Sequence, residues 1–428
     1  MEQLLHYVWK HKLFPLSPLT TTWHQAVEVI DPGLHNRNAG PDFFNAKIKL
    51  NGTLWVGNVE IHDKASDWYV HGHDKDERYD NVILHVCGTI DVEAKNSKGE
   101  PLVQLQLDIP ENVSKHYQEL LSIDQYPPCY QIIPSLTRLT VHSWMSALQT
   151  ERLSQKTDAI EARVKQCNGD WENAYFVTLA RNYGFGINGD AFEQWAYHLP
   201  LRAVDHHRDD LFQIEAIFLG QAGLLELNTI PERYQKDALN DGYFSRLRNE
   251  YLYLSHKFSL QPMDYKQWRF LRPQNFPHIR ISQLANLYYN RRAGLSQLLE
   301  ATTVKEAKQV LSTSVTEYWE THYTFGSTSI RNEKHLSPFS LNLLIINTVV
   351  PILFAYGRHR GEEKYCDRAF DFLEELKAEN NHIVRMWKEC GLPVENAGDS
   401  QALIQLKKEY CDRKECLRCR IGYEYLKR

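Results

Sequence analysis

The sequence predicts an α+β protein, in which a mixed sheet flanked by helices is followed by a large all-α region. Apolar and polar residues alternate on both sides of Asn51-Gly52, the pattern of two strands joined by a tight hairpin turn. From about residue 139 onward, apolar residues recur at spacings of three and four, as in helices that bury one face. We therefore expect the sheet to occupy residues 1–125 and the helical domain to follow it.

The expected elements of the first region are a helix over residues 2–12, a strand over 26–31, the hairpin, a short segment capped by Ser66, and a strand over 81–87. The hairpin has one predicted core face, formed by Phe44, Ala46, Ile48, Leu50, Leu54 and Val56. The later helices are expected at 139–164, 173–183, 209–225, 241–258 and 281–299.

Composition limits the cellular setting. The net charge is −5, so the chain is not a general polyanion binder, although a groove can still be locally positive. The most apolar stretch, residues 341–356, contains two asparagines and a proline and predicts a buried helix, because a bilayer span needs roughly 18 or more apolar residues. No signal-peptide pattern opens the sequence. We expect a cytoplasmic protein without a membrane partner.

Two acidic residues of the hairpin, Asp42 and Glu60, form the first candidate site. If the turn is a three-residue loop with Gly52 in the left-handed region, residue 49 opposes 53 and Asp42 lies opposite Glu60. A two-residue turn would instead place Ile61 opposite Asp42. Carboxylates within about 5 Å repel each other unless protonated, paired or bridged by a cation such as Mg²⁺ or Mn²⁺. His62 faces the same pocket and would hold a proton or serve as a further ligand.

A simpler interpretation of these residues stays open. Asp42 could cap a turn after Pro41, with Glu60 and His62 on a solvated strand edge. On or beside the next strand, Asp80 is interpreted as an auxiliary residue near the site and His85 as a structural histidine.

Pro41-Asp42 followed by Glu60-x-His62 resembles the signature of the PD-(D/E)XK nuclease superfamily, with His62 where that pattern usually has lysine. The resemblance implies an αβββαβ core and metal-dependent hydrolysis of phosphodiester bonds in DNA or RNA. Asp42 and Glu60 would be metal ligands, with the Ile61 carbonyl as a further one. A wider set of motifs between Gly40 and His85 also resembles a bacterial domain family of unknown function, along nearly the whole chain.

Two other functions compete with the nuclease. The histidine at position 62 favours a catalytically silent nucleic-acid-binding protein that keeps the fold. Alternatively, His71, His73 and Asp74 would serve a metal-dependent hydrolase of a small phosphorylated or acylated substrate, because histidines at i and i+2 of an extended segment can converge on a metal.

A basic and aromatic segment, residues 263–292, is the predicted nucleic-acid track. It has six Lys or Arg against one acid, and cations beside rings suit single strands, whose bases stack while phosphates meet charge. The expected contacts are Lys266, Trp268, Arg269, Arg272 and Arg280. The alternative is an ordinary surface with its aromatic residues turned inward.

Four of the eight cysteines fall in the last 39 residues, at Cys390, Cys411, Cys416 and Cys419. They would supply the corners of a Zn²⁺ site or a [4Fe-4S] cluster, in a separate domain over residues 386–428 that follows a helical domain over 126–385. The alternative is unlinked reduced cysteines, as expected for Cys87, Cys129, Cys167 and Cys366. Some PD-(D/E)XK exonucleases carry a four-cysteine iron–sulfur staple with one cysteine before the nuclease core, whereas all four lie after it here.

Overall fold

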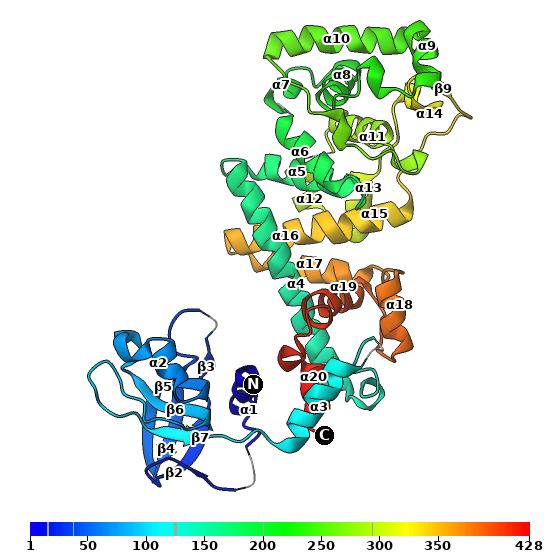
Figure 1. Ribbon diagram of the computed structural model, residues 1–428. Helices are drawn as coiled ribbons and strands as arrows, with labels where there is room; N and C mark the ends of the chain where they lie inside the picture. The colour runs from blue at the N-terminus through cyan, green and yellow to red at the C-terminus, as the bar shows by residue number, and fades with distance from the viewer. Residues whose placement is uncertain (15–16, 37, 124–125, 200, 293) are drawn as a thin grey trace. The chain divides into compact units, whose positions relative to one another are not determined.

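The computed structural model describes residues 1–14, 17–36, 38–123, 126–199, 201–292 and 294–428 (Figure 1). The chain divides into two compact units that are not consecutive segments. The sheet unit contains residues 1–144, 386–392 and 406–428, and the helical unit contains 145–385 and 393–405. The domain boundaries at 125 and 385 therefore stay sequence predictions.

The sheet unit is built on a mixed sheet with the strand order β1-β2-β4-β5-β6-β7, in which β3 pairs with β4. Its strands are β1 (Leu19–Thr20), β2 (Ala26–Asp31), β3 (Leu34–His35), β4 (Phe43–Leu50), β5 (Thr53–Lys64), β6 (Val82–Thr89) and β7 (Gln104–Gln106). The β4–β5 pair is antiparallel, whereas β5–β6 and β6–β7 are parallel. The predicted α+β class with an N-terminal mixed sheet is confirmed.

Short helical segments complete this part of the chain. Helix α1 (Glu2–Lys10) packs against β5 and buries one amphipathic face that includes Val8 and Trp9. Helix α2 (Asp67–Val70) follows Ser66, and the single turns His73–Lys75 and Glu77–Tyr79 lead into β6. Helix α3 (Glu111–Ser122) leaves the sheet and contacts α20 (Arg420–Leu426) near the C-terminus.

The hairpin reaches the expected register by a different route. Leu50 pairs with Thr53, so the connection is the two-residue turn Asn51-Gly52, with both residues at positive φ (47° and 85°). The predicted three-residue loop is wrong because these two residues suit the tighter turn. A β-bulge between Phe43 and Ala46, with Asn45 at φ 55°, then shifts the pairing by one residue, so that Phe43 pairs with Val59.

The two strands of the hairpin differ in burial near the turn. Ala46, Ile48 and Leu50 are buried as expected, but Leu54 and Val56 are 54% and 56% exposed. Their predicted place on the core face is wrong, because only the later part of β5, from Asn58 onward, is buried. The buried part of β5 is therefore its polar end and not the part beside the turn.

Among its described residues, the helical unit is all-α apart from the small pair β8 (His322–Thr324) and β9 (Ser327–Thr328). Its main helices are α5 (Trp171–Tyr183), α6 (Gly189–His198), α7 (Leu201–Asp205), α8 (Leu211–Gln221), α9 (Glu232–Asn240), α10 (Gly242–Phe258), α11 (Pro277–Tyr289), α12 (Leu295–Glu300), α13 (Val304–Leu311), α14 (Glu317–Glu320), α15 (Pro338–Leu344), α16 (Val350–Arg360), α17 (Glu363–Glu375) and α19 (Ala397–Gln405). Helices α4 (Arg138–Gln166) and α18 (His382–Glu389) belong partly to each unit.

Four of the five predicted helices are confirmed as α4, α5, α8 and α10, with Asp210 and Asp241 as side-chain N-caps of the last two. The fifth, expected over 281–299, is wrong as a single helix. The chain leaves α11 after Tyr289, passes through Arg291 at φ 58°, and begins α12 at Leu295.

One helix, Pro338–Arg360, has the length and apolar composition to cross a membrane, and 61% of its most apolar window is buried inside the structure. A π-helical segment, Ile345–Val349, joins α15 to α16 within it. The expected buried helix over residues 341–356 is thus present.

Candidate metal centre

Asp42 and Glu60 hold each other by reciprocal backbone contacts. The backbone N–H of Asp42 donates to Glu60 Oε2 (2.9 Å), and the backbone N–H of Ile61 donates to Asp42 Oδ2 (2.9 Å). Asp42 directly precedes β4 and Glu60 lies in the buried part of β5, so the bulge brings these residues together. The Glu60 side chain is only 6% exposed, which excludes the interpretation as a solvated strand edge.

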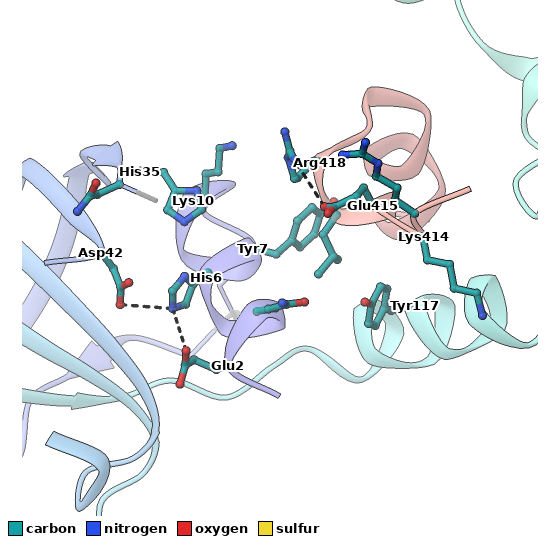
Figure 2. A pocket seen from close by; sticks show the side chains of 14 residues that line it. Glu2, His6, Tyr7, Lys10, His35, Asp42, Tyr117, Lys414, Glu415 and Arg418 are labelled. Carbon is teal, nitrogen blue, oxygen red and sulfur yellow. Dashed lines mark ion pairs between the residues drawn. The ribbon is translucent and has the colours of Figure 1, made fainter. Parts of the chain in front are cut away.

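Helix α1 adds two residues that the sequence analysis missed. His6 Nε2 lies 3.4 Å from Asp42 Oδ2 and 4.0 Å from Glu2 Oε1 (Figure 2). Burial lowers the pKa of His6, and the backbone of Ile61, the group expected to offer a carbonyl to a metal, partly opposes this shift. The i, i+4 spacing of Glu2 and His6 places them on one side of an amphipathic helix, and this was the only signal available in the sequence.

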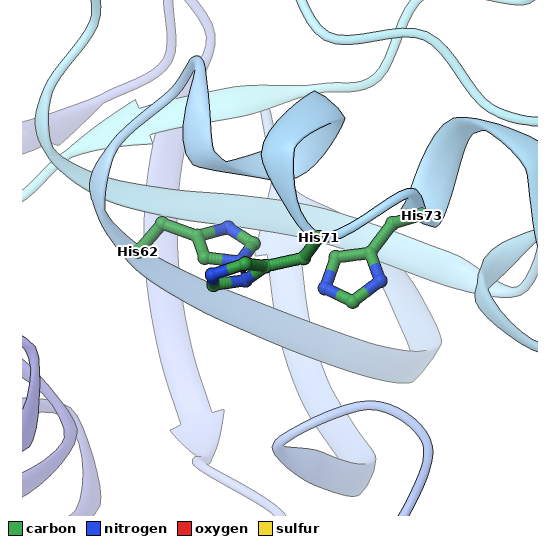
Figure 3. Close-up of side chains that lie close together, drawn as sticks. All are labelled: His62, His71 and His73. Atoms are coloured by element: carbon green, nitrogen blue, oxygen red, sulfur yellow. Dashed lines mark hydrogen bonds between the residues drawn. The ribbon is translucent and has the colours of Figure 1, made fainter.

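Three imidazoles gather on the other side of Glu60. His62 on β5, His71 after α2 and His73 have ligand nitrogens that all lie within 4.8 Å of one another (Figure 3). Glu60 Oε1 is 3.2 Å from His73 Nε2 and 3.8 Å from His62 Nε2. Glu60 therefore joins the carboxylates and the imidazoles into one site. Asp74 does not belong to this cluster.

A second layer of side chains lies behind His62. His62 Nδ1 is 2.9 Å from His85 Nε2, and His62 Nε2 is 3.1 Å from His71 Nδ1. His85 is fully buried and also has Gln104 Nε2 3.5 Å from its Nδ1. Its role is to orient His62, which extends the structural role expected for it.

Burial and like charge shift the titration of this site. Burial, and then the charge of Glu60, raise the pKa of Asp42 from 3.8 to about 8. Burial, and then the neighbouring imidazoles, lower the pKa of His62 to about 2, so this ring is neutral at physiological pH. A crowded acid pair beside the neutral His62 ring is suited to receive a cation.

Asp80 does not reach the site. Its carboxylate accepts hydrogen bonds from the backbone N–H and the hydroxyl of Ser97 (3.1 and 2.9 Å). The expected auxiliary role is wrong, because Asp80 instead fixes the turn before β7.

A pocket of about 500 Å³ adjoins Asp42 (Figure 2). The acid-site residues Glu2, His6 and Asp42 form part of its wall. Basic side chains from α1 and the C-terminal segment form another part: Lys10, Arg413, Lys414 and Arg418. Carboxylates and cations thus line one cavity within the sheet unit.

The predicted nucleic-acid track in the helical unit is only partly available. Trp268 is 3% exposed, and its Nε1 donates to the Ala222 carbonyl (2.9 Å), so its expected role in base stacking is wrong. Arg280 is also buried, with its guanidinium donating to Gln283 and Asn275 (2.8 and 2.7 Å). Lys266, Arg269 and Arg272 are exposed, and their contact with nucleic acid stays a prediction.

The C-terminal cysteines are grouped differently from the expected set. The thiols of Cys411, Cys416 and Cys419 act electrostatically on the thiol of Cys129. The pKa of Cys390 is raised by burial and then by Glu389, with no contribution from these thiols. Cys390 thus stands apart from these thiols, whereas Cys129, which we expected to be an unlinked cysteine, lies near them.

Comparison with known proteins identifies a family but no activity. A family described as "Protein of unknown function (DUF2851)" matches residues 2–382. This match confirms the expected resemblance to a family of unknown function along nearly the whole chain. No curated protein and no solved structure matches the chain.

Proposed function

Since this chain belongs to the DUF2851 family, whose description assigns no activity, we propose from the site that it is a metal-dependent nuclease. The observation that carries the proposal is that the carboxylate of Glu60 contacts two other site residues. Its Oε2 accepts the backbone N–H of Asp42, and its Oε1 lies 3.2 Å from His73 Nε2. The PD-(D/E)XK-like pattern of Asp42, Glu60 and His62 gives the reaction class.

The donor set fits a divalent ion. The two carboxylates repel each other, and His6 Nε2 is buried beside Asp42 without a hydrogen-bond partner. Asp42, Glu60 and His73 would hold the ion, with His71 at the solvent-exposed side. Carboxylate ligands suit Mg²⁺ and Mn²⁺, whereas imidazole ligands favour transition metals, so the mixed set favours Mn²⁺. When bound, such an ion activates water and stabilises charge on a phosphate.

The protein's own groups would supply positioning and hydrogen bonding. The bulge and the reciprocal backbone contacts fix both carboxylates before substrate arrives. Neutral His62 would donate a hydrogen bond in place of the usual lysine. The basic wall of the adjoining pocket would attract phosphate groups toward Asp42.

The test is cleavage of end-labelled single- and double-stranded DNA and RNA by the full chain with Mn²⁺ or Mg²⁺. We expect cleavage that is stronger with Mn²⁺, that is lost in Glu60→Gln, and that persists in the matched control Glu93→Gln, an exposed glutamate of the same unit. Nucleic acid that is retarded but intact would support the silent binding protein instead.

The hydrolase of small substrates keeps one supporting observation, the cluster of His71 and His73 with His62. Turnover of small phosphoesters or acyl esters that is lost in His71→Ala, without nucleic-acid cleavage, would select it over the nuclease.

A further inference from the structure

The last residues of the chain form a tightly folded cysteine segment. Cys411 ends a π-helical turn (Leu406–Cys411), and Cys416 begins a single turn (Cys416–Arg418) that leads through Cys419 into α20. The backbone N–H of Cys419 donates to the Cys416 carbonyl (3.2 Å). A Cβ at Gly422 would lie 2.1 Å from that same carbonyl oxygen, so only glycine permits this close return.

Two residues from a distant part of the sequence, Tyr126 and Trp144, contact residues next to these cysteines. Tyr126 Oη donates to Asp412 Oδ1 (3.0 Å), and the Trp144 ring meets the Tyr410 ring edge-on at 5.2 Å. The segment between Tyr126 and Trp144 carries Cys129, which is 8% exposed. The thiols of Cys419, Cys411 and Cys416 are close enough to act on it electrostatically. Four thiols from segments almost 300 residues apart thus share one interior region.

Cys419 is buried in this region, close to possible hydrogen-bond donors. The backbone N–H groups of Gly422 and Ile421 lie near its thiol. The buried indole Nε1 of Trp144 lies near the same thiol and has no hydrogen-bond partner among the described residues. Donors directed at a cysteine sulfur are the outer-shell contacts that support thiolate ligands.

We propose that Cys129, Cys411, Cys416 and Cys419 form a four-thiolate centre for a thiophilic metal, either one Zn²⁺ or an iron–sulfur cluster, which fastens the C-terminal segment to residues 126–144. Four thiolates complete the coordination of both types of centre, and no ligand from Cys390 is needed. The centre is independent of the proposed nuclease site, because it shares no residue with it.

The test is metal analysis of the full chain purified without oxygen or chelator. We expect zinc, or iron with equimolar acid-labile sulfide and a brown colour, in a fixed ratio to protein. That content should fall roughly tenfold or more in Cys129→Ser and stay unchanged in the matched variants Cys390→Ser and Cys366→Ser. Glu60→Gln should keep this metal, which separates it from an ion at the nuclease site.

Alkylation of the wild-type chain covers the case in which Cys129→Ser does not fold. We expect chelator or oxidant to make Cys129, Cys411, Cys416 and Cys419 reactive together, while Cys390 reacts at the same rate throughout. Wild-type protein that holds neither metal even after reconstitution, or a loss of metal in Cys390→Ser equal to that in Cys129→Ser, would overturn the proposal.

Discussion

Replacing Asp42 by Asn should stabilise the metal-free protein at alkaline pH. The folded pKa of Asp42, about 8, lies above its ordinary value of 3.8. The protonated carboxyl therefore contributes stability that is complete below pH 3.8 and is lost as the pH rises through 8. The amide introduced by Asp42→Asn would remain neutral at every pH, and its oxygen can still accept the N–H of Ile61.

The size of the effect follows from the shift. One pKa unit corresponds to about 1.36 kcal/mol, so the three units between pH 5 and pH 8 set an upper bound of about 4 kcal/mol. The Asp42 side chain is 23% exposed, and water reaches the ionised carboxylate. We therefore expect about half of this bound, roughly 2 kcal/mol, or a rise in melting temperature of roughly 4–8 °C for a unit of this size.

The assay is thermal unfolding of both proteins in EDTA and in Mn²⁺, at pH 5 and pH 8. In EDTA, the advantage of Asp42→Asn should grow with pH. In Mn²⁺, the order should reverse at pH 8, because a bound cation stabilises the wild-type carboxylate and not the amide. A pH-independent difference between the proteins in EDTA, or a variant that is less stable at pH 8, would refute the argument from crowded acids.

Three other outcomes follow from the structure. Asn45→Gly should keep stability and cleavage, whereas Asn45→Val should cost roughly 1–2 kcal/mol in urea unfolding and weaken cleavage, because a β-branched residue resists the positive φ of the bulge. Trp268→Ala should destabilise the helical unit by about 3–5 kcal/mol in the same assay, with Arg269→Ala as a near-neutral control. Replacing both Arg413 and Arg418 by Ala should reduce the salt dependence of DNA binding by a slope of about 2, and an unchanged slope would exclude the basic pocket wall as a phosphate contact.

The sequence predicts the sheet, the main helices and the acid pair, because these depend on local periodicity and turn residues. The sequence could not place the bulge, because Asn45 looks like any exposed strand residue. The bulge near Asn45 shifts the register that the two-residue Asn51-Gly52 turn sets. The prediction that Asp42 and Glu60 are neighbours was still correct. The expected three-residue loop and the observed two-residue turn differ by one residue in register, and the bulge shifts the pairing by the same one residue.

Contacts between distant segments were the main source of error. Cys129 lies 282 residues before Cys411, so sequence spacing could not connect them. Cys390 is close to Cys411 in the sequence and was therefore predicted to be the fourth metal ligand. Trp268 occurs in a proline-containing loop that looks exposed in the sequence. Its indole instead donates a hydrogen bond to the carbonyl of Ala222, at the end of α8. Such pairings depend on tertiary packing and not on local pattern.

The row of imidazoles behind Glu60 also determines which tautomer each ring adopts. The Gln104 amide is anchored by the Ala94 N–H and the Val92 carbonyl (3.2 Å each), which directs its NH₂ group toward His85 Nδ1. Neutral His85 then carries its hydrogen on Nε2 and donates it to His62 Nδ1, which leaves the hydrogen of His62 on Nε2. That nitrogen faces Glu60 and the open end of the row, so His62 is prepared to donate a hydrogen bond and not to coordinate an ion.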